Sequence, residues 1–373
     1  MRLVLKIGSN ILANDKGLNS RRISSIAANA ARLRESGHEV IIVSSGAVAA
    51  GTRKMGLKKR PVEVKLKQAA AAVGQSTLMW SYEKSFKAHG IIVAQILLTR
   101  EGLSNRTMHI NAKNTIVTLL SHGIVPIVNE NDTVATEEIK FGDNDKLASL
   151  VAECAEADRL IILSDVDGLF DRDPKRYRSA RIIHKVEKID DEIICCAGSC
   201  TSSYGSGGMR SKLQAAENAT RSGITVNIIN GNRPSQILAL ISGKKVGTEF
   251  SSHKTPLSAR KAWIAHGSKS RGSLRLDEGA INALLVKGRS LLPSGIIAVE
   301  GNFNAGDSVK CMAPNGSLIA KGITDYSSEE LRKIAGKKTG EIEGILGYKY
   351  SDEVIHRDNL VITASTVQDS PSD

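Results

Sequence analysis

The stretch that decides the fold is VPIVNENDTVATEEIKFGDND, residues 125–145, in which a short apolar run passes directly into amides and carboxylates. The apolar part, 124–128, is rich in β-branched residues and is typical of a strand covered on both faces. In an open α/β sheet, ligands bind in the crevice beyond the carboxyl ends of the strands. The polar residues could therefore hold an amine, a carboxylate or a metal-bound phosphate, although a solvated acidic loop would have the same composition.

On either side of this stretch, residues 1–250 alternate between strand-like and helix-like segments. Strands are predicted at 3–7, 40–44, 91–98, 124–128, 160–164 and 225–229, and helices at 19–36, 66–88, 105–121, 144–155 and 208–222. This βαβα order predicts a three-layer αβα sandwich around a mostly parallel sheet, in a first domain at 1–255.

The pattern changes near Pro256. We expect a polar, basic linker at 256–272 and then a small β-rich barrel at 273–352, where short strand-like pieces alternate with glycines. The tail 364–373 is polar, has no core-facing pattern and is expected to be disordered.

Composition narrows the functional classes. The chain has 373 residues, 24% of them charged, and no apolar run approaches the length of a membrane span. No secretory signal is recognisable, and five cysteines without zinc-site spacing do not predict a disulfide framework, so a cytoplasmic protein is expected. The net charge of +12 favours anionic partners, which could be RNA or an anionic substrate.

Three glycine-bearing turns are candidates for phosphate binding. They are KIGSN at 6–10, SSGA at 44–47 and GSGGMRSK at 205–212, each next to a predicted strand or helix end, where free backbone amides suit an anion. The spacing of a P-loop, of a dinucleotide fold and of a protein kinase is absent. Each turn alone is weak evidence, but Lys6 and Lys212 beside them favour phosphate chemistry.

A carboxylate acceptor would explain this set of residues. A free carboxyl has a pKa of about 4 and is already ionised at neutral pH, so no general base is needed. Catalysis then consists of positioning and of neutralising charge on the phosphoryl group. Lys6, Lys212 and a magnesium ion would suffice, with Asp145 orienting the lysines. The turn SDVDGLFD at 164–171 is interpreted as a nucleotide contact or as a plain acidic turn.

The segments KIGSN, VSSGAVAAG, LLTR, IVPIVNENDTV, FGDND, LSDVDGL and GSGGMRSKLQAA resemble the amino acid kinase family, and most closely its glutamate 5-kinases, over roughly residues 1–255. The segments DEGAINALLVKGRSLLPSGI, VEGNFNAGDSV and AKGITDYSSEELRKIAG resemble the PUA domain attached to bacterial-type members. The resemblance implies an amino acid kinase fold followed by a PUA-like barrel, and ATP-dependent phosphorylation of the side-chain carboxylate of L-glutamate to L-glutamyl 5-phosphate, the first step of proline biosynthesis from glutamate.

The family's functional positions carry over residue by residue. The resemblance implies Lys6, Lys212 and Asp145 as catalytic residues, and Ser45, Asp132 and Asn144 as glutamate-binding residues. It implies a nucleotide site, with ATP and Mg²⁺, formed by Lys6, Ser164, Asp165, Ser206, Gly207, Gly208, Met209, Arg210, Ser211 and Lys212. Ser164 stands where many relatives have threonine and keeps the hydroxyl; the magnesium ligands are not specified.

The resemblance also implies partners. These are proline as a feedback inhibitor at the glutamate site, a glutamate semialdehyde dehydrogenase that takes up the labile acyl phosphate, and further copies of the chain in a homo-oligomer. Two alternatives stay open: an RNA-binding or RNA-modifying protein that acts through the PUA-like domain, and a kinase of the same fold acting on aspartate or acetylglutamate.

Overall fold

The structure is a computed structural model of the 373-residue chain, and it describes all residues except 15–16, 136–143, 175, 198–207, 253–257, 259–260, 262–263, 266–269 and 364–373. The chain divides into two compact units, Met1–Pro256 and Leu257–Asp373. The predicted tail and part of the predicted linker lie outside the described residues. In the described part, no helix is long and apolar enough to cross a membrane.

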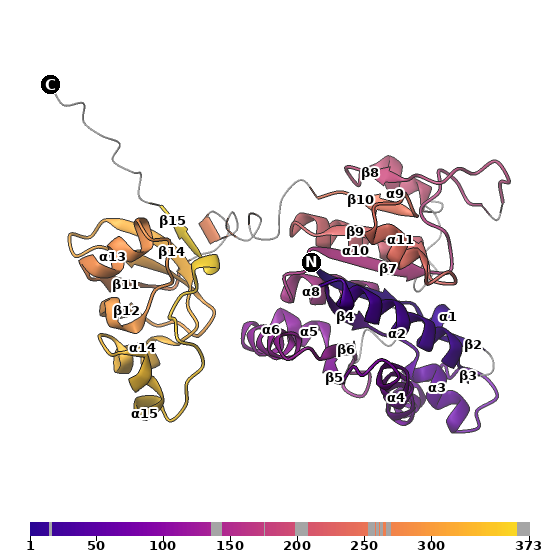
Figure 1. Cartoon of the computed structure of the whole chain (residues 1–373), viewed down its shortest axis with the longest axis horizontal. Helices are drawn as coiled ribbons and strands as arrows, with labels where there is room; N and C mark the ends of the chain where they lie inside the picture. Colours follow the sequence, from indigo (N-terminus) through magenta and orange to yellow (C-terminus); the bar gives the residue numbers. More distant parts are fainter. Residues whose placement is uncertain are drawn as a thin grey trace. The chain divides into compact units, whose positions relative to one another are not determined.

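The first unit is built on a mostly parallel sheet (Figure 1). Its strands are β1 (Arg2–Ile7), β4 (Glu39–Val43), β5 (Val93–Leu98), β6 (Val125–Glu130), β7 (Arg159–Ser164), β8 (Lys185–Val186), β9 (Thr225–Asn230) and β10 (Thr248–Phe250). They lie in the order β5-β6-β4-β1-β7-β9-β10-β8, and neighbours from β5 to β9 are parallel. Within the described sheet, the two short strands at the other end run in the opposite direction: β10 is antiparallel to β9, and β8 is parallel to β10. β2 (Ala13–Asn14) and β3 (Gly17–Leu18) form a separate antiparallel pair.

Helices cover both faces of this sheet. They are α1 (Ser9–Leu12), α2 (Ser20–Glu35), α3 (Ala47–Lys54), α4 (Val64–Lys87), α5 (Arg100–Ser104), α6 (Arg106–Ser121), α8 (Asp145–Cys154), α9 (Asp191–Cys196), α10 (Met209–Arg221) and α11 (Gln236–Ile241). Alternate residues of β1 face opposite layers: Leu3 and Leu5 join a core with α2, α4 and α11, whereas Val4 joins a core with α6, α8 and α10. The predicted three-layer αβα sandwich is thus confirmed.

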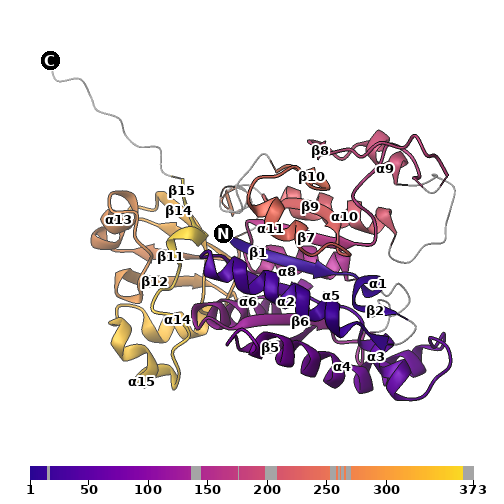
Figure 2. The same cartoon turned by 45° about the vertical axis from the view of Figure 1, so that its right-hand side comes forward.

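Close packing of α3 against α4 fixes one wall of the site (Figure 2). A Cβ atom at Gly51 would lie 1.6 Å from the carbonyl oxygen of Ala70, and one at Gly74 would lie 1.9 Å from that of Ala47. Only glycine fits at these two positions, because any side chain would overlap the backbone of the facing helix. α3 begins after Gly46, whose φ of 102° lies in the left-handed region.

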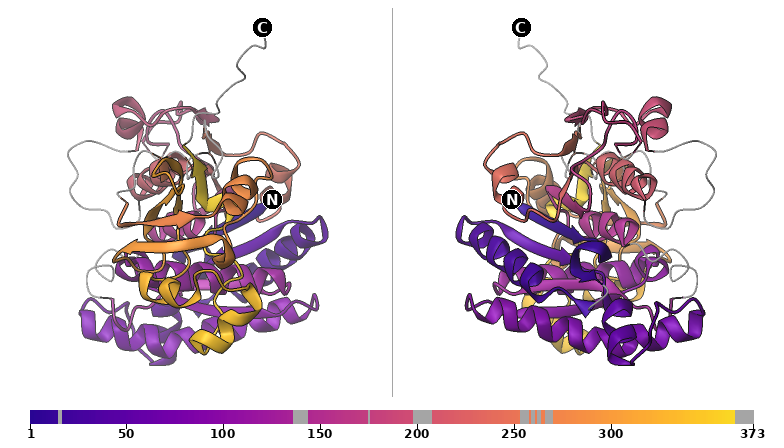
Figure 3. Two further views of the ribbon diagram at one scale, coloured as in Figure 1. Left: turned by 90° about the vertical axis from the view of Figure 1, so that its left-hand side faces the viewer. Right: turned by 90° about the vertical axis from the view of Figure 1, so that its right-hand side faces the viewer.

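The second unit is the predicted small β-rich domain, drawn in orange and yellow in Figure 3. Its strands are β11 (Gly272–Leu276), β12 (Ile296–Gly301), β13 (Ser308–Met312), β14 (Leu318–Ile323) and β15 (Leu360–Ile362), in the order β12-β11-β13-β14-β15. Its helices are α13 (Glu278–Leu285), α14 (Ser328–Ile334) and α15 (Ile342–Leu346). A separate apolar core that includes Leu274, Val309 and Leu331 holds them together.

Candidate active site

A buried ion cluster joins the three residues predicted to be catalytic. The Lys6 ammonium contacts Oδ1 of Asp145, and Nζ of Lys212 lies 3.0 Å from Oδ2 of the same carboxylate. The exposed fractions are 1% for Lys6, 0% for Asp145 and 7% for Lys212. Charges this deeply buried are kept only where they are paired and hydrogen-bonded. Asp145 therefore holds two ammonium groups side by side at one point.

The fold explains why these three side chains meet. Lys6 interrupts the apolar run of β1 and, by strand alternation, points to the same face as Val4, the face covered by α8 and α10. Asp145 is the first residue of α8, and Lys212 lies in the first turn of α10. Ser211 adds a hydrogen bond from Oγ to Oδ2 of Asp145 at 2.8 Å. The cluster thus lies where two helix N-termini approach the end of the central strand, a favourable place for anions.

Next to the cluster, the side-chain amide of Asn144 is held in one orientation. Its Nδ2 donates to the carbonyl oxygen of Ser44 at 2.5 Å and to Oδ1 of Asn129 at 2.8 Å. Asn129 in turn donates from Nδ2 to Oε1 of Gln75 on α4 at 2.8 Å. The amide nitrogen of Asn144 is thus engaged within the protein, and the group that it presents to a ligand is its carboxamide oxygen, a hydrogen-bond acceptor. The sequence identified Asn144 and placed Asn129 among the polar residues that could hold a ligand, but it did not predict their contact or the part played by Gln75.

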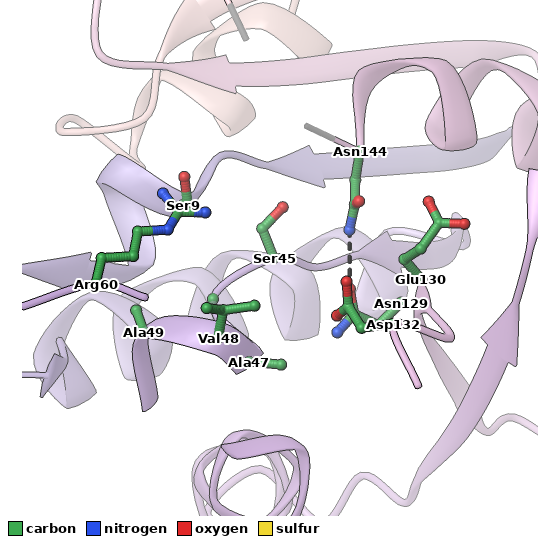
Figure 4. Close-up of a pocket in the computed structure, with 11 residues that line it drawn as sticks. Ser9, Ser45, Ala47, Val48, Ala49, Arg60, Asn129, Glu130, Asp132 and Asn144 are labelled. Atoms are coloured by element: carbon green, nitrogen blue, oxygen red, sulfur yellow. Dashed lines mark hydrogen bonds between the residues drawn. The ribbon is translucent and has the colours of Figure 1, made fainter. Parts of the chain in front are cut away.

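A hollow beside Asn144 brings together the three residues predicted to bind the amino acid (Figure 4). It is lined by Ser9, Ser45, Gly46, Ala47, Val48, Ala49, Arg60, Asn129, Glu130, Asp132 and Asn144, and its empty volume is about 510 Å³ with the open mouth included. Figure 4 shows Ser45 between Arg60 on one side and Asn144 with Asp132 on the other. The hollow thus presents both signs of charge as well as hydroxyl and amide groups.

The two acids of the hollow have different surroundings. Desolvation raises the pKa of the partly buried Asp132 to about 6, and the positive charge of Arg60 lowers it only in part. Glu130, 4% exposed, has its carboxylate 3.7 Å from Nε of Arg100 at the start of α5. Glu130 thus already faces a positive charge. Asp132 is the carboxylate of this hollow whose charged form a cationic group of a ligand would stabilise most.

The predicted nucleotide residues lie at the ends of β7 and α10. Ser164 ends β7, and its Oγ donates to Oδ1 of the exposed Asp165 at 3.2 Å. Burial raises the pKa of Asp165, but hydrogen bonds from Asn10 and Ser164 and the charge of Lys212 together lower it below its usual value. Gly208 caps α10, and the other predicted residues of this turn follow as its first residues: Met209, Arg210, Ser211 and Lys212. Ser206 and Gly207 lie outside the described residues.

Known proteins with similar sequences identify the family. The profile of the amino acid kinase family matches residues 1–230. The glutamate 5-kinase of Geobacter sulfurreducens is 50% identical over 362 residues, which cover 97% of both chains. The chain belongs to the amino acid kinase family, among the glutamate 5-kinases. The glutamate 5-kinase of Caldanaerobacter subterraneus subsp. tengcongensis is 48% identical over 97% of this chain and 98% of its own.

Two further matches concern the second unit and the fold of the first. The PUA domain profile matches residues 272–346 of this chain, so the second unit contains a PUA domain. Among solved structures, the UMP kinase from Bacillus anthracis covers 68% of this chain and 96% of its own, with a TM-score of 0.48 and 17% identity, a likeness too distant to indicate an activity.

The described residues of this amino acid kinase do not form a metal site made of protein ligands alone. In the described ranges, no group of three or more His, Cys, Asp or Glu side chains could hold an ion. Each oxygen of Asp145 already contacts a lysine. Magnesium typically keeps several waters and binds through one or two carboxylates together with substrate phosphates. These residues are therefore compatible with Mg²⁺ that arrives bound to the nucleotide.

Proposed function

We propose that this chain transfers the γ-phosphoryl group of ATP to the side-chain carboxylate of L-glutamate. The product is L-glutamyl 5-phosphate, and the reaction is the first step of proline biosynthesis from glutamate. The observation that carries the proposal is the buried Lys6–Asp145–Lys212 cluster, directly beside a hollow that contains Ser45, Asp132 and Asn144. The family membership of the chain supports the same reaction.

In this mechanism the two lysines neutralise charge on the phosphoryl group as it moves. Asp145 is a positioning residue that fixes both ammonium groups, and a Mg²⁺ ion carried by ATP supplies further positive charge at the phosphates. Asp132 binds the substrate ammonium, while Ser45 and Asn144 offer hydrogen bonds to the substrate. Ser164, Asp165 and residues 206–212 contact the nucleotide. The acceptor is ionised from the start, so positioning and charge neutralisation carry the reaction.

The reaction is tested with purified protein, ATP, Mg²⁺ and L-glutamate, with hydroxylamine to trap the acyl phosphate. Aspartate and acetylglutamate are run in parallel. Glutamate-dependent hydroxamate supports the proposal, whereas preference for another acceptor reassigns the substrate. Lys6→Met should lower kcat by orders of magnitude, while the matched change Lys87→Met, at an exposed lysine in the last turn of α4, should leave it unchanged.

Several partners follow from the proposed reaction. L-Proline shares the α-amino acid head with glutamate, so we propose that it competes for the same hollow as a feedback inhibitor. The acyl phosphate hydrolyses readily, which favours hand-over to a glutamate semialdehyde dehydrogenase in the cytoplasm. Homo-oligomer formation, and RNA binding by the second unit, stay predictions. A salt-dependent affinity for RNA that survives deletion of 1–255 would support the latter.

A further inference from the structure

An acidic amino acid brings three charges into the hollow, and the roles assigned above account for two of them. If the proposed function is right, the side-chain carboxylate faces Lys6 and Lys212, and the ammonium group pairs with Asp132. The α-carboxylate then still needs a counter-charge. Carboxylates that leave water are stabilised mainly by charge-assisted hydrogen bonds. None of the residues assigned so far supplies a positive charge for this group.

Arg60 supplies a positive charge at this place. It is the cationic side chain among the described residues that line the hollow, and it makes no hydrogen bond or ion pair with any residue of the described ranges. Figure 4 shows its guanidinium group directed into the hollow toward Ser9 and Ser45, with Asp132 beyond Ser45. The charge of Arg60 also acts on Asp132, whose pKa it lowers. The positive and the negative group thus lie close enough to interact across one small space.

We propose that Arg60 binds the α-carboxylate of the amino acid substrate and makes the site specific for acceptors with a free α-carboxylate. The inference rests on the proposed function and extends it to the recognition of the amino acid head. With Arg60 on one side and Asp132 on the other, the hollow matches the carboxylate and the ammonium of an α-amino acid.

Two properties of Arg60 suit this role. The guanidinium group is planar and pairs with a carboxylate through two parallel hydrogen bonds, a geometry that lysine does not provide. Arg60 also lies in the connection between α3 and α4, outside both helices, and its side chain is exposed and forms no hydrogen bond or ion pair with the residues that the structure describes. Its neighbours Lys58 and Lys59 carry the same charge but do not line the hollow. The pocket geometry therefore singles out Arg60 from a basic run that looks uniform in the sequence.

The test compares L-glutamate with L-isoglutamine, which keeps the ammonium and the side-chain carboxylate but has a neutral carboxamide in place of the α-carboxylate. For L-glutamate, Arg60→Gln should raise KM about 10- to 100-fold, the value of hydrogen bonds to a charged group, with kcat nearly unchanged. For L-isoglutamine the same variant should behave like the wild type. Arg60→Lys should restore part of the preference for glutamate, and Lys59→Gln is the matched control with unchanged kinetics. If isoglutamine turns over too slowly, its Ki against glutamate gives the same comparison.

Other outcomes overturn the inference. An unchanged KM for L-glutamate in Arg60→Gln rejects it directly. An equal fall of kcat with both acceptors would mean that Arg60 acts on the moving phosphoryl group instead. These results differ from failure of the proposed function, in which the wild-type protein itself would form no hydroxamate from glutamate and this inference would fall with it. Arg60 is exposed, so the substitution should not prevent folding, and a circular dichroism spectrum checks this.

Discussion

Replacing Asp145 by asparagine tests whether the buried carboxylate organises the two lysines. Asparagine has nearly the same size and shape, so Asp145→Asn removes the charge and leaves the packing of α8 in place. Lys6 and Lys212 then face each other without their shared counter-charge. Because all three residues are at most 7% exposed, water cannot take the place of the carboxylate.

The expected magnitude follows from this burial. Removing one partner of a buried ion pair costs about 3–5 kcal/mol, and the lower end applies here because the carboxamide oxygen still accepts one hydrogen bond. A loss of about 3 kcal/mol corresponds to a fall in Tm of roughly 6–12 °C for a domain of this size. Differential scanning calorimetry measures this fall in the transition of the first unit. A non-hydrolysable ATP analogue should stabilise the variant more than the wild type, because its phosphates replace the missing negative charge.

The same variant should also lose activity. Misplaced lysines no longer neutralise the phosphoryl group, and we expect kcat to fall about 100-fold or more. Ser211→Ala is the comparison, since it removes a neutral hydrogen bond to the same carboxylate and should cost about 1 kcal/mol of stability. An Asp145→Asn protein with wild-type Tm and kcat would refute the proposed role of the cluster.

Three further predictions concern other parts of the first unit. The pKa of Asp132 is raised to about 6 by desolvation, so this carboxyl is charged at neutral pH and loses its charge as the pH falls through 6; kcat/KM for glutamate should decline below that pH, and Asp132→Asn should lack the inflection in a pH–rate profile. Gly74→Ala should force α3 and α4 apart and destabilise the fold by about 1–3 kcal/mol in urea unfolding, whereas Gly344→Ala, whose Cβ would meet nothing within 4 Å, should be nearly neutral. Asp165→Ala should raise KM for ATP and leave KM for glutamate unchanged, which initial-rate kinetics with each substrate varied in turn would check.

Much of the fold was predictable because the central strands carry strong local signals. β1, β4, β6, β7 and β9 are short, β-branched and apolar, and their predicted ranges agree with the structure to within two residues. Lys6 stands out in the sequence because it interrupts such a run, and strand alternation then gives the face to which it points. The edge strand β8 and its neighbour β10 were not predicted, since two or three residues give no periodic pattern.

The parts of the site that sequence reasoning missed depend on contacts between distant segments. Gln75 lies on α4 and reaches Asn129 at the end of β6, a relation set by helix-to-sheet packing rather than by spacing. Arg60 belongs to a basic run, Lys58 to Arg60, that has the composition of an ordinary solvated surface. Only the position of the α3–α4 connection distinguishes it from the two lysines before it. Residue chemistry could therefore predict that Lys6, Asp145 and Lys212 meet, but not the full lining of the hollow.

The geometry of Asp145 bears on which acceptors the site can use. An alcohol acceptor needs a general base within hydrogen-bond reach to take its proton. Each oxygen of Asp145 contacts a buried ammonium group, and Oδ2 also accepts a hydrogen bond from Ser211, so this carboxylate is paired with two positive charges and is poorly suited to take a proton. A carboxylate acceptor has already lost its proton at neutral pH and needs only to be held in line with the phosphoryl group. The arrangement that positions the two lysines therefore also favours a carboxylate over a hydroxyl as the group that is phosphorylated.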